Sequence, residues 1–203
     1  LATDTQGSHS TAIGRRALKS QNFTSATDTH NTGIGNNSGQ SITTANSCTA
    51  VGSNSLSSNQ TGNSNTAVGE SALTSTTSAN NTAIGAGAGN AITSGAKKTI
   101  VGMYNGNQDG LDLRTSSNNI VISDGDGNAR LRCNQYGALS VRTDIDQGIY
   151  VFTGGTNNTN GKAIEFYDGN NHSCGVIRIN QSANTVSYNT SSDHRLKENV
   201  TDL

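Results

Sequence analysis

A short motif, Thr-Ala-(Ile or Val)-Gly, recurs six times between residues 11 and 102 and limits the folds open to this chain. The copies are spaced by 21, 17, 17, 16 and 17 residues, and they begin at Thr11, Thr32, Thr49, Thr66, Thr82 and Thr99. Gly33 and Ile100 replace the Ala in two copies. A regular period this short predicts a solenoid, in which each repeat forms one coil and the coils stack on each other.

Each copy of the motif has the pattern of a short β-strand. The Thr and the Ile or Val alternate with the Ala, so they share one face of the strand. We expect this face to point into the coil and to form an inward ladder of Ile13, Ile34, Val51, Val68, Ile84 and Val101. The Gly after each strand permits a tight turn or close backbone packing. A small residue followed by Leu comes next, and we call this pair the second apolar step. It predicts a second strand in the coil, at Ala17-Leu18, Ser55-Leu56 and Ala72-Leu73.

The composition favours a repetitive β structure whose subunits bury surface against each other. Only 31% of the 203 residues are hydrophobic and 4% are aromatic, with no Trp and no Pro, so a monomer can build little core. The net charge of -1 argues against disorder, which usually comes with high charge or Pro. It also argues against nucleic acid as a partner. No apolar run reaches transmembrane length, so we expect no membrane insertion.

The repeat resembles the head repeats of trimeric autotransporter adhesins, and similar Asn-Thr-Ala-Ile-Gly arrays occur in many phage fibres. The adhesin repeats are shorter, so the resemblance concerns the strand pattern and not the period. It implies an all-β, elongated homotrimeric fibre with left-handed parallel β-roll-like repeats followed by an interwoven β-module. We assign residues 1–104 to the β-roll.

Residues 105–133 are predicted to form a β-hairpin connector. Two alternating segments, 117–123 and Ala129–Cys133, flank the turn signal Asp124-Gly125-Asp126-Gly127-Asn128. A calcium loop is a competing interpretation of the Asp residues. The remainder of the calcium-loop pattern, including its distal Glu, is missing, so we predict no metal here.

Residues 134–191 are predicted to form a β-rich tip module. Strands are expected at 138–142, 148–153, 163–167, 175–180 and 185–188, with Gly- and Asn-rich turns between them. Such a segment can interweave between three chains. Its loops are the best candidates for contact with a host surface.

Charges cluster suddenly in the last thirteen residues, which run from Ser191 to Leu203. The stretch Ser192-Asp193-His194-Arg195-Leu196-Lys197 resembles the opening of the intramolecular chaperone domain, or peptidase S74 domain, of bacteriophage tail fibres and tailspikes. The resemblance implies that the precursor cuts itself between Ser191 and Ser192, in a site that trimerisation completes. We assign 192–203 to the start of this chaperone. The family domain continues well past the motif, so we do not expect this stretch alone to cleave itself.

Residue chemistry is compatible with that cleavage. A Ser hydroxyl needs a base to become a nucleophile, and a buried Lys can be that base. Ser192 and Lys197 could form such a Ser-Lys pair, supported by Asp193 and Arg195. The competing interpretation is an ordinary helix start, because Ser or Asp is a good N-cap.

These patterns predict the structural and receptor-binding part of a phage tail fibre, located in the virion after assembly in the host cytoplasm. Its expected partners are two further copies of the chain, other tail proteins and a host-surface saccharide or protein. No cofactor and no substrate-directed activity are expected. The alternatives are a bacterial trimeric adhesin and a tailspike that degrades polysaccharide. A tailspike needs paired carboxylates, and the candidates are Glu70, Glu165, Glu198, Asp144, Asp146 and Asp168.

Cysteines and histidines give no site in the sequence. Three distant cysteines, Cys48, Cys133 and Cys174, argue against a disulfide framework or a zinc site. The four histidines are also scattered, although threefold symmetry could gather three copies of one around an axial ion: they are His9, His30, His172 and His194.

Overall fold

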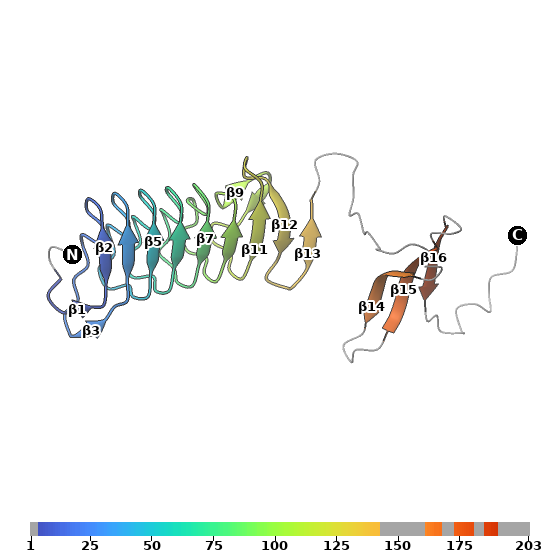
Figure 1. The fold of residues 1–203 in the computed structure, drawn as a ribbon, viewed down its shortest axis with the longest axis horizontal. Coiled ribbons are helices and arrows are strands. Elements are labelled where there is room, and N and C mark those ends of the chain that lie inside the picture. The colour runs from blue at the N-terminus through green and yellow to red at the C-terminus, as the bar shows by residue number, and fades with distance from the viewer. Residues whose placement is uncertain (1–3, 143–160, 168–172, 181–184, 191–203) are drawn as a thin grey trace, which may run out of the picture. The chain divides into compact units, whose positions relative to one another are not determined.

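The computed structural model describes residues 4–142, 161–167, 173–180 and 185–190, with side chains up to residue 142. Strands and turns make up this part of the chain, which contains no helix. The chain divides into two compact units, Leu1–Asp146 and Gln147–Leu203. The first unit is a stack of coils and the second contains a small antiparallel sheet (Figure 1).

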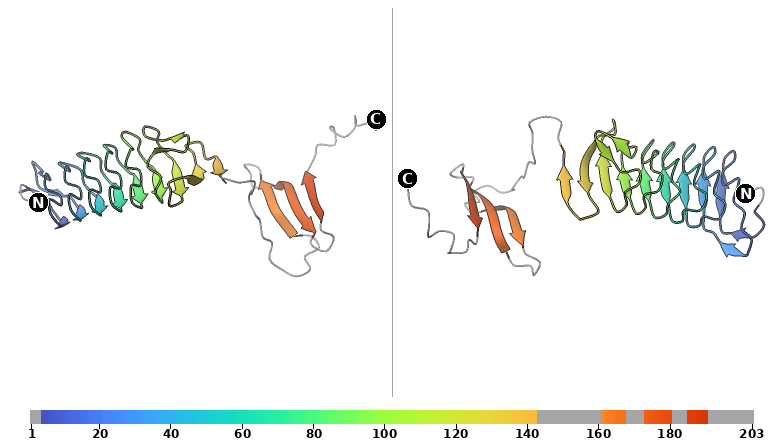
Figure 2. Two further views of the ribbon diagram at one scale, coloured as in Figure 1. Left: turned by 90° about the horizontal axis from the view of Figure 1, so that it is seen from above. Right: turned by 180° about the vertical axis from the view of Figure 1, so that it is seen from behind.

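A nine-stranded sheet runs along the first unit in the order β13-β12-β11-β8-β7-β6-β5-β4-β2. Its members from β2 to β11 pair in parallel, one strand from each coil, as the repeat predicts. Figure 2 shows these strands side by side from two further directions. Their bounds are β2 (Thr11–Ile13), β4 (Thr32–Ile34), β5 (Thr49–Val51), β6 (Thr66–Val68), β7 (Thr82–Ile84), β8 (Thr99–Val101), β11 (Ile120–Ser123), β12 (Ala129–Cys133) and β13 (Leu139–Val141).

Equivalent motif residues lie opposite each other in every pair of coils. Thr49 pairs with Thr66, and Val51 pairs with Val68. The change in spacing from 17 to 16 residues between β6 and β7 leaves this register intact, because the turns absorb the difference. The sequence period therefore becomes a ladder in which each motif position faces the same motif position of the next coil.

The expected inward ladder of Ile and Val is wrong. Ile13 is 59% exposed and Ile84 is 44% exposed, whereas Ala50 and Ala67 are fully buried. Thr and Ile or Val do share one face of each strand, but that face is the outer one. The middle residue of the motif is the one that points into the coil.

The reason for this orientation is the narrow interior of the coil. A Cβ added at Gly33 would lie 2.9 Å from Cγ of Leu18, so only a small middle residue fits opposite that leucine. Where Gly89 takes the place of the leucine, a larger middle residue fits, and Ile100 is buried there. The leucines of the second apolar step thus fill the space that the sequence pattern assigned to the motif Ile and Val.

The second apolar step does not form a second strand, which corrects that expectation. Leu18, Leu56 and Leu73 lie in turns with positive φ angles of 47°, 49° and 49°. Backbone hydrogen bonds still connect the coils at this level, for example from Leu56 N–H to the Ala72 carbonyl at 3.0 Å. Each coil therefore has one strand and a hydrogen-bonded turn, and in the coils of Leu18, Leu56 and Leu73 this turn brings a leucine into the core.

The Gly after each strand has the role that the sequence predicts. Gly35 has φ 128°, and a Cβ there would lie 2.7 Å from the carbonyl oxygen of Gly52 in the next coil. Both the backbone conformation and the close stacking of coils therefore require glycine.

Hairpins follow the last coil. β11 and β12 pair antiparallel across the Asp124–Asn128 turn, as expected, and β12 then pairs antiparallel with β13. Short two-stranded pairs flank the main sheet: β1 (Gly7–Ser8) with β3 (Thr27–Asp28), and β9 (Asn107–Gln108) with β10 (Leu111–Asp112). In the second unit, β14 (Gly161–Tyr167), β15 (Ser173–Asn180) and β16 (Thr185–Thr190) form an antiparallel sheet at three of the expected places. The strand expected at 148–153 lies outside the described residues.

Candidate interaction surface

The outer face of the nine-stranded sheet carries two rows of side chains. The register places one residue per strand in what we call the apolar row: Ile13, Ile34, Val51, Val68, Ile84, Val101, Ile122, Leu131 and Val141. The second row, the threonine row, consists of Thr11, Thr32, Thr49, Thr66, Thr82, Thr99, Ile120, Cys133 and Leu139. None of these residues is charged.

Exposed hydrophobic side chains concentrate on this face. In the part of the chain whose side chains the structure describes, all the exposed large hydrophobics except Met103 and Tyr136 belong to the two rows. The exposure reaches 63% at Leu139. Scattered exposed hydrophobics need no explanation, but a contiguous apolar face marks a place of contact.

Beneath the strands lies a buried polar ladder that our sequence analysis did not identify. Its members occupy the position before the strands β2, β4, β5, β6, β7, β8 and β11, and all are buried except the half-buried Ser10: Ser10, Asn31, Cys48, Asn65, Asn81, Lys98 and Asn119. Oδ1 of Asn65 accepts the backbone N–H of Asn81 at 2.9 Å, and Asn65 Nδ2 donates to the Ser78 carbonyl at 2.7 Å. The asparagines therefore satisfy backbone groups inside the stack. Their recurrence before Thr was a readable signal in the sequence.

Lys98 interrupts this ladder. Its side chain is buried, and Nζ has no hydrogen-bond partner in the structure. Burial lowers the pKa of the Lys98 amine from 10.5 to about 8. An ammonium group has no acceptor, so Lys98 cannot perform the accepting role of the asparagines.

The Asp124 turn uses its carboxylate internally. Oδ1 accepts the backbone N–H groups of Asp126 and Asn128 at 3.0 and 2.9 Å. Oδ2 accepts Nε of Arg130 at 2.8 Å and Nδ2 of Asn128 at 3.2 Å. Burial alone would raise the pKa of Asp124, but these hydrogen bonds outweigh it and hold the pKa at about 2. The carboxylate thus closes the turn, and within the described residues no cluster of His, Cys, Asp and Glu could hold a metal.

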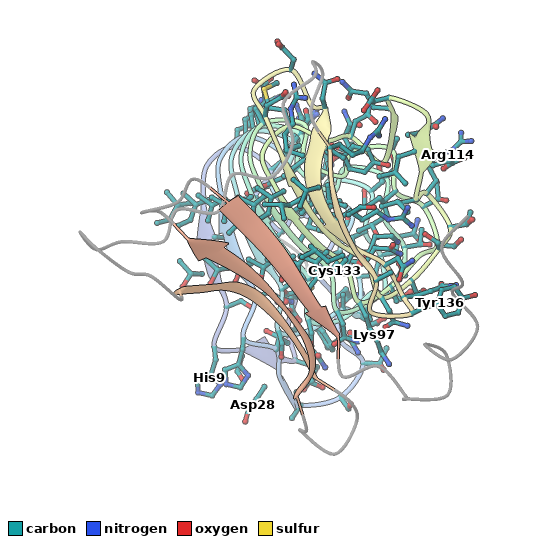
Figure 3. The ribbon with its side chains drawn as sticks, turned by 90° about the vertical axis from the view of Figure 1, so that its right-hand side faces the viewer. His9, Asp28, Lys97, Arg114, Cys133 and Tyr136 are labelled. Carbon is teal, nitrogen blue, oxygen red and sulfur yellow. The ribbon has the colours of Figure 1, made fainter. Side chains whose placement is uncertain are left out.

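Two histidines meet on the first coils. The rings of His9 and His30 stack with centroids 5.3 Å apart, and Nδ1 of His9 lies 3.1 Å from Oδ1 of Asp28. Figure 3 shows His9 and Asp28 side by side. Both histidines have positive φ and lie two residues before a motif Thr, so the stacking follows from the coil repeat.

The carboxylates and cysteines of the sequence analysis are dispersed or undescribed. Glu70 is exposed in a turn of the stack. Cys48 and Cys133 are free thiols, and burial raises the pKa of Cys48. The structure does not describe Asp144, Asp146, Asp168, His172, His194 and Glu198, nor the side chains of Glu165 and Cys174.

The cleavage motif also lies outside the described residues. Ser192, Asp193, Arg195 and Lys197 all belong to the segment 191–203, so their assignment remains a prediction from the sequence.

Comparisons with known proteins found no match: no family model, no curated protein and no solved structure is similar to this chain. Within the described residues, no helix is long and apolar enough to span a membrane.

Proposed function

We propose that this chain is a structural and receptor-binding part of a bacteriophage tail fibre that acts as a homotrimer. The observation that carries the proposal is the uncharged outer face of the sheet, which extends over all nine strands. A stack of similar coils with an exposed apolar face suits a structural element that assembles with other subunits.

Maturation of this fibre involves release of a C-terminal chaperone before Ser192. The supporting evidence is the sequence Ser192-Asp193-His194-Arg195-Leu196-Lys197 and its place after a β-rich segment. Ser192 is the nucleophile, Lys197 is the base that takes its proton, and Asp193 and Arg195 support the pair. Attack of the Ser192 hydroxyl oxygen on the Ser191 carbonyl forms an ester and breaks the Ser191–Ser192 amide bond, and Lys197 passes the proton to the freed Ser192 amine. Water then hydrolyses the ester.

Intact mass spectrometry of the full-length gene product tests the processing. We expect wild type to be cut between Ser191 and Ser192, and Ser192→Ala to stay whole. Ser191→Ala is the matched control, because it changes the neighbouring hydroxyl and should still be cut. An uncut wild-type trimer would remove the self-cleavage from the proposal.

Host recognition is tested by adsorption. Cells incubated first with the purified chain should bind fewer phage particles, because the chain occupies the receptor. Unchanged adsorption at saturating chain concentration would contradict the receptor-binding role.

A further inference from the structure

The apolar and threonine rows on the outer face expose hydrophobic surface that a partner could bury. All the exposed large hydrophobics in the described part of the chain except Met103 and Tyr136 lie there, while the coil interior is already filled. Apolar surface left in water costs about 25 cal/mol for each Å². Within residues 4–142, the exposed apolar surface that favours association therefore lies mainly on this face.

The regular spacing of side chains along the rows favours a partner with the same spacing. Neighbouring strands lie about 4.8 Å apart, so the apolar row presents an Ile, Val or Leu at every step. A second sheet packs face to face on such a row and matches it at each step. Another copy of this chain has the same steps over all nine strands, whereas an irregular surface matches only a few of them.

The residue types along the two rows favour parallel over antiparallel packing of the copies. The threonine row carries Thr from β2 to β8 and then changes to Ile120, Cys133 and Leu139. Parallel, in-register copies place this wholly apolar end on the same end of the neighbouring copy. Antiparallel copies would bury Thr hydroxyls against leucine and isoleucine, without hydrogen-bond partners.

We infer that the outer face formed by the apolar and threonine rows is the contact between copies of this chain, packed parallel and in register. The inference rests on the homotrimer of the proposed function, and it adds the face, the direction and the register. Each strand of one copy then meets the same strand of the next.

A triple variant tests the face. Val51→Thr, Val68→Thr and Ile84→Thr keep β-branched side chains on their strands but remove apolar contacts. Light scattering after size exclusion should give an oligomer for wild type and at least tenfold weaker association for the variant. Ser58→Glu is the control, since Ser58 is exposed in a turn away from the strands and should leave the oligomer intact. Circular dichroism checks that each protein is folded.

Mixed cysteine crosslinking tests the register. In a Cys133→Ser background, a tagged Val51→Cys chain is refolded with an untagged Val101→Cys chain. Oxidation should join Val51→Cys chains to each other and Val101→Cys chains to each other. Mixed disulfides would show a shifted or antiparallel arrangement and overturn the register.

The outcomes separate this inference from the proposed function. A wild-type monomer, or a folded triple variant with wild-type association, overturns the interface. If the triple variant associates like wild type and its precursor is still cleaved before Ser192, the interface is wrong but the fibre proposal is retained. Loss of association in the triple variant, together with an uncut wild-type precursor, supports the interface and removes the self-processing.

Discussion

The side-chain oxygen of Asn81 accepts the backbone N–H of Lys98 at 3.1 Å, in the same way that Asn65 serves Asn81 one coil earlier. The backbone of Lys98 is hydrogen-bonded in this way. Its side chain, which occupies the next position of the ladder, ends in a buried amine that has no hydrogen-bond partner. Burying such a group without compensation is costly, so Lys98 is a weak point in the stack.

Replacing Lys98 should stabilise the protein at neutral pH. Its pKa is about 8 in the folded state against 10.5 ordinarily, so between these values the unfolded state binds more protons. Stability therefore rises with pH across this window, by up to about 3 kcal/mol. Lys98→Met should raise the free energy of unfolding at pH 7 and much less at pH 10.5, as measured by urea denaturation. Lys97→Met, at the exposed neighbour, is the control, and an equal gain at both pH values would contradict the prediction.

Gly35→Ala should destabilise the stack. Its φ of 128° and the close approach of the Gly52 carbonyl both oppose a Cβ, and strained backbone alone costs about 1–3 kcal/mol. Gly125→Ala is the matched control, since a Cβ there meets nothing within 4 Å. Thermal unfolding of both variants measures the difference. A similar melting temperature for the two would show that the coils can separate to admit a Cβ.

A large apolar core side chain occurs either at the position of Leu56 or three residues later in the coil, but not at both, and a double variant tests this. Coils with Leu56 or Leu73 have polar Asn59 or Thr76 three residues later, whereas the coil of Gly39 has Ile42 there. A Cβ at Gly39 would lie 2.8 Å from Cδ2 of Leu18 and 2.9 Å from Cδ1 of Ile42. All these side chains occupy the same interior, so one large group excludes the other.

Gly39→Leu alone should therefore overpack the coil and cost about 1–3 kcal/mol. Ile42→Asn alone should leave a cavity. The double variant reproduces the pattern of Leu56 and Asn59, so it should recover part of the loss, while the contact with Leu18 remains. Denaturant unfolding of all four proteins gives the coupling free energy. If the losses in free energy of unfolding of the two single variants simply add in the double variant, the two positions do not compete for the same space.

Asp124 should make the protein sensitive to acid. Its folded-state pKa of about 2 lies below the ordinary 3.8, so its stabilising hydrogen bonds are present above about pH 4 and are lost as pH falls through 2. Asp124→Asn should lower the melting temperature at pH 5 and flatten its decline toward pH 2. Asp126→Asn is the control in the same turn. A wild-type decline retained in Asp124→Asn would assign the acid sensitivity to other carboxylates.

Local features of the fold could be predicted because they depend on neighbouring residues. The strand positions, the Gly after each strand and the turn between β11 and β12 follow from alternation, φ preference and turn residues. The recurrence of Asn31, Asn65 and Asn81 before a motif Thr was visible too, but their role needs the adjacent coil to supply the N–H that each accepts.

The repeat period and the alternation within each motif were enough to predict a solenoid in which Thr shares a strand face with Ile or Val. Which of the two faces is buried could be known only from the packed coil. Leu18 enters the coil from a turn and leaves room for no more than Gly33 opposite, so the branched side chains are turned outward. Alternation fixes the two faces of a strand, but the volume available between distant segments decides which of them is buried.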